Sequence, residues 1–105
     1  MNLTSYLQDG SLTIALTGEI DHHTAKLYIS AIAAKIEAYT PHSCTLDFRD
    51  VSFMDSSGIA VVINAMRAIK HFSGELFISG LREQPMKVIR LSGIDRLVRI
   101  KEEVS

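Results

Sequence analysis

The chain has 105 residues, of which 47% are hydrophobic and 22% are charged, and this size suits one compact domain, residues 1–105, with a single core. Lys and Arg number 11 against 12 Asp and Glu, which argues against a polybasic nucleic-acid surface and against an acidic tail. We therefore expect protein partners or small ligands, and no nucleic acid.

The cysteine content and the first residues narrow the setting of the protein. Cys44 is the only cysteine, which rules out an intrachain disulfide and a metal site made of several cysteines. The segment Met1–Tyr6 lacks the basic end and the uninterrupted apolar stretch of a secretory signal, and no segment approaches membrane-spanning length. We expect a soluble cytoplasmic protein with no membrane partner.

The first residues predict a β-hairpin. Leu12–Leu16 alternates apolar with small or polar side chains, as a half-buried strand does, and Asp9-Gly10 before it is a tight-turn signal. Residues around Leu3 to Gln8 are therefore predicted to form a first strand, paired antiparallel with the second.

A long helix is predicted next. Asp21 offers an N-cap and Pro41 ends the helical pattern. The predicted buried stripe, at three-and-four spacing, consists of Ala25, Tyr28, Ile29, Ile32, Ile36 and Tyr39.

The middle of the chain predicts a central strand followed by a second helix. Cys44–Phe48 reads as a buried strand, and its apolar character continues to Phe53 and Met54. The helix is expected to begin at Ser56-Ser57 and to expose Asn64, Arg67 and Lys70. Its predicted core face consists of Ile59, Val62, Ile63, Met66 and Ile69.

The last third predicts a strand, a helix and a short final strand. Gly74 precedes a strand over Glu75–Ser79; Pro85 suits the first turn of a third helix and Gly93 its end. Met86, Ile89 and Leu91 are expected to face the sheet, Leu97–Ile100 to form the last strand, and Lys101–Ser105 to fray.

Strands that alternate with helices predict an α/β fold, with a mixed and mostly parallel sheet, an N-terminal antiparallel hairpin and helices packed on it. Functional loops in such sheets tend to lie at the C-terminal ends of strands, where Asp55 and Ser56 are expected. Taken alone, the run from Asp55 to Gly58 reads as a helix cap. Gly58 suits either a close approach of backbone or partner, or a tight first turn.

Two motifs in order resemble the STAS domain, and within it the bacterial anti-sigma factor antagonists of the sporulation and stress-response type. Thr17–Ala25 resembles the segment after the second strand of that family, and Leu46–Gly58 resembles its phosphorylation loop. Leu91-Ser92-Gly93 matches a further element, and the resemblance extends to about Ile100. Members commonly carry a further C-terminal helix, whereas this sequence ends at Ser105.

The resemblance implies partner switching. The unphosphorylated antagonist binds an anti-sigma factor that is also a serine kinase, which frees a sigma factor, and phosphorylation of the loop serine ends the binding. By position this serine is Ser56, and Asp55, Ser57 and Gly58 complete the switch loop. A separate serine phosphatase would restore the active form. The resemblance implies no cofactor and no enzymatic activity.

A partner-facing surface beside the loop is predicted from residues at the end of the second strand: Glu19, Asp21 and His23. The alternative for Asp21 is that it only caps its helix. Adjacent His22 and His23 point in different directions at a helix start, so we expect no metal site.

Two other functions compete with partner switching. The same fold also suits a STAS subunit of a transport, membrane-lipid or multiprotein stress complex. An enzyme with Ser56 as nucleophile and a histidine base is disfavoured, because the sequence has no G-x-S-x-G elbow and no recognisable pair of histidine and carboxylate.

Overall fold

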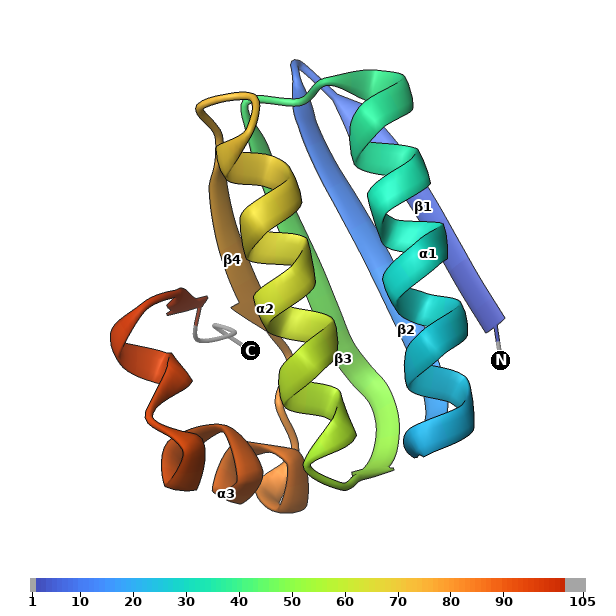
Figure 1. Ribbon diagram of the computed structural model, residues 1–105, viewed down its shortest axis with the longest axis vertical. Coiled ribbons are helices and arrows are strands. Elements are labelled where there is room, and N and C mark those ends of the chain that lie inside the picture. Colours follow the sequence, from blue (N-terminus) through green and yellow to red (C-terminus); the bar gives the residue numbers. More distant parts are fainter. Residues whose placement is uncertain (1, 102–105) are drawn as a thin grey trace.

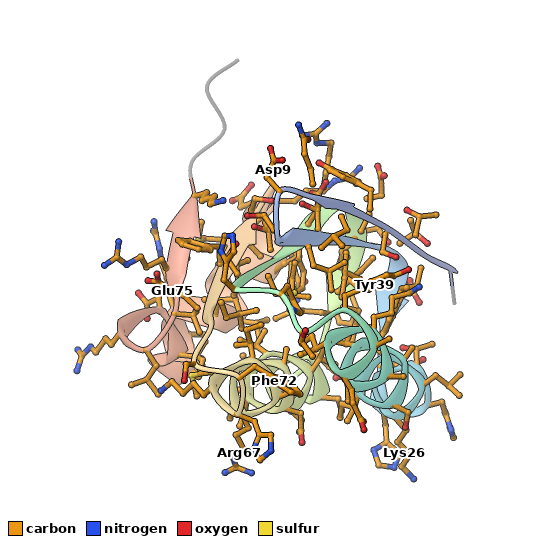
Figure 2. All side chains as sticks on the ribbon, turned by 90° about the horizontal axis from the view of Figure 1, so that it is seen from above. Asp9, Lys26, Tyr39, Arg67, Phe72 and Glu75 are labelled. Carbon is orange, nitrogen blue, oxygen red and sulfur yellow. The ribbon has the colours of Figure 1, made fainter. Side chains whose placement is uncertain are left out.

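The computed structural model describes residues 2–101, which form two layers. The strands are β1 (Asn2–Gln8), β2 (Ser11–Ile20), β3 (Ser43–Met54), β4 (Glu75–Ser79) and β5 (Arg99–Lys101). The helices are α1 (His22–Tyr39), α2 (Ser57–Lys70), α3 (Glu83–Ser92) and the short 3-10 helix η1 (Ile94–Arg96). Figures 1 and 2 show α1 and α2 side by side on one face of the sheet, with Lys26 and Arg67 pointing away from it.

The sheet has the predicted mixed topology. Its strand order is β1-β2-β3-β4-β5, in which β1 and β2 are antiparallel and the other neighbours are parallel. The hairpin turns through Asp9 and Gly10, whose φ angles of 51° and 79° both lie in the left-handed region. Asp-Gly tolerates these angles, which explains why the tight turn forms here.

The core lies between the sheet and the helices. Side chains of β2 alternate along the strand, with Leu12, Ile14 and Leu16 buried beneath the helices. Cys44 on β3 is buried as predicted, and burial raises the pKa of its thiol to about 12. Because the thiolate is the reactive form, this cysteine is expected to be inert.

Helix α2 is rotated slightly from the predicted core face. Its buried residues are Gly58, Val61, Val62, Ala65 and Ile69. Ile59, Ile63 and Met66 are only partly buried against this core, so the prediction that they are core residues is corrected. The periodicity located the apolar side of the helix, whereas the neighbouring α1 decides which residues are fully covered.

Two residues predicted to be buried are exposed instead, and the last strand begins later than predicted. Tyr39 is the last residue of α1 and is 48% exposed, while Leu91 lies in the last turn of α3 and is 88% exposed. Each lies at a helix end, where the helix no longer covers the core. The last strand was predicted over Leu97–Ile100, but β5 begins at Arg99, and Leu97 precedes it and is 64% exposed.

The predicted end of the chain is corrected in one respect. Lys101 was expected to fray, but it is the last residue of β5 and pairs with Ser79 of β4. The rest of that prediction concerns residues 102–105, which lie outside the described part of the chain. No helix within residues 2–101 combines the length and the apolar character needed to cross a membrane.

Candidate functional site

The fold brings the two sequence motifs together at one edge of the sheet. Strands β2 and β3 are parallel neighbours, and their ends pair Glu19 with Phe53 and Ile20 with Met54. The backbone N–H of Asp55 donates to the carbonyl oxygen of Ile20 at 3.1 Å. Consequently α1 and α2 begin at the same end of the sheet, the lower end in Figure 1.

At the start of α1, Asp21 and Thr24 form a capping box. The Asp21 Oδ1 atom accepts hydrogen bonds from the backbone N–H groups of His23 and Thr24, both at 2.9 Å. In return, the Thr24 hydroxyl oxygen accepts from the backbone N–H of Asp21 at 2.9 Å. The backbone N–H of Thr24 is the main cause that lowers the pKa of Asp21, because it stabilises the carboxylate form. Asp21 therefore caps its helix, as its predicted N-cap position requires.

At the start of α2, the capping group is Asp55 and not the serine that follows it. The Asp55 Oδ1 atom accepts from the backbone N–H of Ser57 at 2.8 Å, and the Asp55 carbonyl oxygen accepts from the N–H of Gly58 at 3.0 Å. Ser56 occupies the N-cap position with helical φ and ψ angles of −62° and −17°. A residue with these angles does not direct its side chain back to the first turn as an extended N-cap residue does.

The Ser56 side chain is thus left for other contacts. Its hydroxyl makes no capping hydrogen bond, and the residue is exposed. The neighbouring Ser57 and Asp55 are partly buried, so Ser56 is the more accessible of the two serines. A hydroxyl in this position can be reached by another protein without opening the helix.

Gly58 is required by close packing. It is buried, and a Cβ atom added to it would lie 2.6 Å from the Sδ atom of Met54, a side chain that is itself fully buried. The predicted reasons for glycine here were a close approach of backbone or partner, or a tight first turn, whereas the structure shows a close approach of a side chain, that of Met54 at the end of β3. This contact fixes the start of α2 against the end of the strand.

Gln84 of α3 holds the end of β3 from the other side. Its Oε1 atom accepts from the backbone N–H of Met54, and its Nε2 atom donates to the Met54 carbonyl oxygen, both at 2.9 Å. Gln84 was not among the predicted site residues, since one polar residue beside Pro85 has no periodicity and no spacing that marks it.

The surface around Ser56 combines charged and apolar side chains. Glu19 and His23 are exposed, as a partner-facing role would need, and Phe53 opposite Glu19 is 43% exposed. His22 and His23 contact each other edge to face, with ring centroids 5.7 Å apart. Within residues 2–101, no group of three or more His, Cys, Asp or Glu side chains is arranged to hold a metal ion.

An open cavity among the described residues lies away from this site. It has a volume of about 710 Å³ and lies between α2, α3 and β5, and its lining includes Met66, Met86 and Arg90. None of the predicted switch-loop or partner-facing residues lines it. This cavity is therefore separate from the candidate site around the exposed Ser56.

Comparison with known proteins assigns the family. The family model of the STAS domain, which describes its sequences, matches residues 2–105 of this chain. The chain therefore belongs to the STAS domain family.

Relatives of known role and solved structures agree with this assignment. The chain is 26% identical over 91 residues to the anti-sigma F factor antagonist of Paenibacillus polymyxa, covering 87% of this chain and 78% of that protein. It is 31% identical over 84 residues to the anti-sigma F factor antagonist of Lysinibacillus sphaericus, covering 80% and 72%.

The similar structures include the anti-sigma factor antagonist SpoIIAA in its unphosphorylated form, with a TM-score of 0.83, 24% identity, and coverage of 99% of this chain and 90% of that chain. The phosphorylated form of the Bacillus cell fate determinant SpoIIAA gives a TM-score of 0.74 at 24% identity, with coverage of 99% and 93%. At this identity the structures establish the fold.

Proposed function

We propose that this chain is an anti-sigma factor antagonist: unphosphorylated, it binds an anti-sigma factor that is also a serine kinase, and phosphorylation of Ser56 ends the binding. A serine phosphatase restores the binding form. The protein acts by association and not by catalysis.

The observation that carries the proposal is that Asp55 and not Ser56 caps the start of α2. Asp55 caps the helix through the Ser57 N–H, while the exposed Ser56 hydroxyl makes no capping hydrogen bond. A kinase can modify this hydroxyl without removing a cap on which the helix depends. The names of the relatives, both anti-sigma F factor antagonists, support the class of partner.

The electrostatics of the loop favour a local block of binding. A phosphate adds about −1.5 to −2 charges to a chain whose formal net charge is −1. The N-terminus of α2 favours an anion by about 0.3–1 kcal/mol, but the Asp55 carboxylate already accepts from the N–H of Ser57. The added charge therefore has little compensation within the domain.

A partner that lies flat on this surface would bury the added charge. Leaving a buried charge unpaired costs about 3–5 kcal/mol, and each 1.4 kcal/mol or so changes affinity tenfold. A partially desolvated phosphate is thus sufficient for a switch, while the fold of the domain remains as it is.

The role of Asp55 argues for binding over catalysis. Its Oδ1 atom accepts from the backbone N–H of Ser57, which gives this carboxylate a structural role at the start of α2. No general base is needed on this chain when the kinase supplies the chemistry.

The experiment that tests the proposal is site mapping of phosphorylation. The protein is incubated with ATP and with the anti-sigma factor of its host, and phosphopeptides are sequenced by mass spectrometry. We expect one phosphate per chain, on Ser56.

The matched variants are Ser56→Ala, which should take up no phosphate and still bind, and Ser57→Ala, which should be phosphorylated normally. Phosphate on Ser57 alone, or on a residue outside the loop, would contradict the proposal.

A further inference from the structure

On the side of β3 that faces away from β2, the hydrogen-bonding neighbour differs between the first and the second half of the strand. Strand β4 pairs with β3 only from Ser43 to Asp47, whereas β3 continues to Met54. The last residues of β3, which lead directly into the switch loop, therefore have no strand on this side.

The chain that leaves β4 takes the place of the missing strand. A Cβ atom added to Gly80 would lie 2.9 Å from the backbone nitrogen of Arg49, so the backbone at this glycine runs close against β3. Two residues further on, the Nε atom of Arg82 donates to the carbonyl oxygen of Arg49 at 2.8 Å. The first turn of α3 follows and reaches the end of the strand (Figure 1).

Gln84 completes this edge at the residue before the loop. Successive residues of a strand direct their N–H and C=O groups to opposite sides, and Asp55 donates toward β2, to the carbonyl oxygen of Ile20. The N–H and C=O of Met54 point the other way, and the Gln84 amide meets both at 2.9 Å. A primary amide carries one acceptor and two donors, so it satisfies this backbone as a neighbouring strand would.

We infer that Gln84 is a positioning residue for the switch loop: it fixes the backbone at Met54 and thereby the direction in which Asp55 and Ser56 leave the strand. Its importance for regulation rests on the proposed function of Ser56. Its effect on the loop is a property of this chain alone and can be measured without a partner.

The test uses Gln84→Glu, which keeps the shape of the side chain. A protonated carboxyl group can donate to the Met54 oxygen and accept from the Met54 N–H, as the amide does. The ionised form can still accept, but it places a negative oxygen against the Met54 carbonyl oxygen. The pKa of the new carboxyl group should therefore rise above the ordinary value of about 4.3.

The stability of Gln84→Glu should fall as the pH rises. Since the pKa is raised in the folded state, the variant is most stable, relative to the unmodified chain, below a pH of about 4.3 and loses that stability as the pH rises through the raised pKa. The chain with Gln84 carries the same other titratable groups, so the difference between the two isolates position 84.

The readout is nuclear magnetic resonance of the loop. We expect the carbonyl carbon of Met54 and the amide nitrogens of Asp55 and Ser56 to shift with the titration of the new carboxyl group. Gln84→Leu, which removes both hydrogen bonds at every pH, should speed hydrogen exchange of the Met54 amide by about tenfold or more, with no pH dependence in the loop shifts beyond that of the unmodified chain.

The matched control is Glu83→Gln, a neighbour on α3 whose side chain is 88% exposed, and it should leave the loop shifts unchanged. A carboxyl group that titrates near its ordinary pKa without moving Met54, Asp55 or Ser56 would overturn the inference. So would normal hydrogen exchange of Met54 in Gln84→Leu. Failure of the kinase to label Ser56 would instead overturn the proposed function and leave these shifts as they are.

Discussion

The starts of α1 and α2 lie at the same end of the sheet and are built differently. At α1, the Asp21 side chain accepts from two backbone N–H groups and Thr24 reciprocates, so the side chain at the N-cap position serves the helix. At α2, the cap comes from Asp55 one residue earlier, and the Ser56 side chain at the N-cap position makes no capping hydrogen bond.

At α1 the side chain at the N-cap position is needed for the helix start, whereas at α2 it can be modified without loss of the cap. A modification of Asp21 or Thr24 would break the capping box, whereas a modification of the Ser56 hydroxyl leaves the Asp55 cap in place. Residue type alone does not make this distinction, because Asp and Ser are both favoured N-caps. It depends on which residue adopts extended backbone angles, as Asp21 does with φ of −117° and ψ of −173°.

The largest expected effect on stability at α2 comes from Gly58→Ala. Alanine in place of glycine normally favours a helix by about 1 kcal/mol, but here the new methyl group would meet the buried Sδ atom of Met54. Overpacking costs about 1–3 kcal/mol, and three atoms of the buried Met54 side chain lie within 3.2 Å of the added Cβ, so we take the upper end of that range. We expect a net loss of about 2 kcal/mol in the free energy of unfolding, measured by urea denaturation.

The same contact can be tested from its other side. In a Met54→Ala background, which removes the thioether, Gly58→Ala should become neutral or stabilising. If Gly58→Ala stabilises the unmodified chain as well, the packing account of this helix start is wrong.

Asp55→Ala should have the next largest effect. It removes the acceptor of the Ser57 N–H, and loss of such a cap costs about 0.5–2 kcal/mol. Ser56→Ala, one residue further on, should change the free energy of unfolding by less than about 0.5 kcal/mol, since its hydroxyl caps nothing. Equal losses for the two variants, measured by the same denaturation, would remove the distinction between the two helix starts.

The smallest effect is a pH dependence at α1. The hydrogen bond from the Thr24 backbone lowers the pKa of Asp21 below the ordinary aspartate value of 3.8. A group with a lowered folded pKa contributes stability above its unfolded pKa and loses it as the pH falls through the folded pKa. The thermal midpoint of the unmodified chain, relative to Asp21→Asn, should therefore fall as the pH is lowered below 3.8.

Asparagine also caps a helix but does not titrate, which makes Asp21→Asn the matched reference. The midpoints of the two proteins are compared by circular dichroism over the acid range. A difference that stays constant through this range would show that the carboxylate of Asp21 adds nothing to the capping box.

Much of the fold follows from the sequence because its signals are local. Asp9-Gly10 specifies a turn, alternation marks β2, and Gly74 and Gly93 bound the elements next to them, as the structure confirms. The extent of burial is not local. Tyr39 and Leu91 fit the helical apolar pattern, but both lie at helix ends where no neighbouring element covers them.

The candidate site also has features that the sequence predicts and features that depend on the tertiary structure. The two motifs place Asp21 and Asp55 at adjacent strand ends, because parallel strands end at the same edge of a sheet. The support from Gln84 was not predictable, since it depends on how far β4 accompanies β3 and on where the first turn of α3 then lies. Which of Asp55 and Ser56 caps α2 also needed the backbone angles.

The central claim is that phosphorylation of Ser56 blocks the partner while the domain keeps its fold. Isothermal titration calorimetry of the Ser57→Ala protein with its anti-sigma factor, before and after phosphorylation, tests it most directly. We predict an affinity at least about 30-fold lower after phosphorylation, equivalent to about 2 kcal/mol, with an unchanged circular dichroism spectrum. Equal affinities of the two forms, or a phosphorylated protein that has unfolded, would contradict the account.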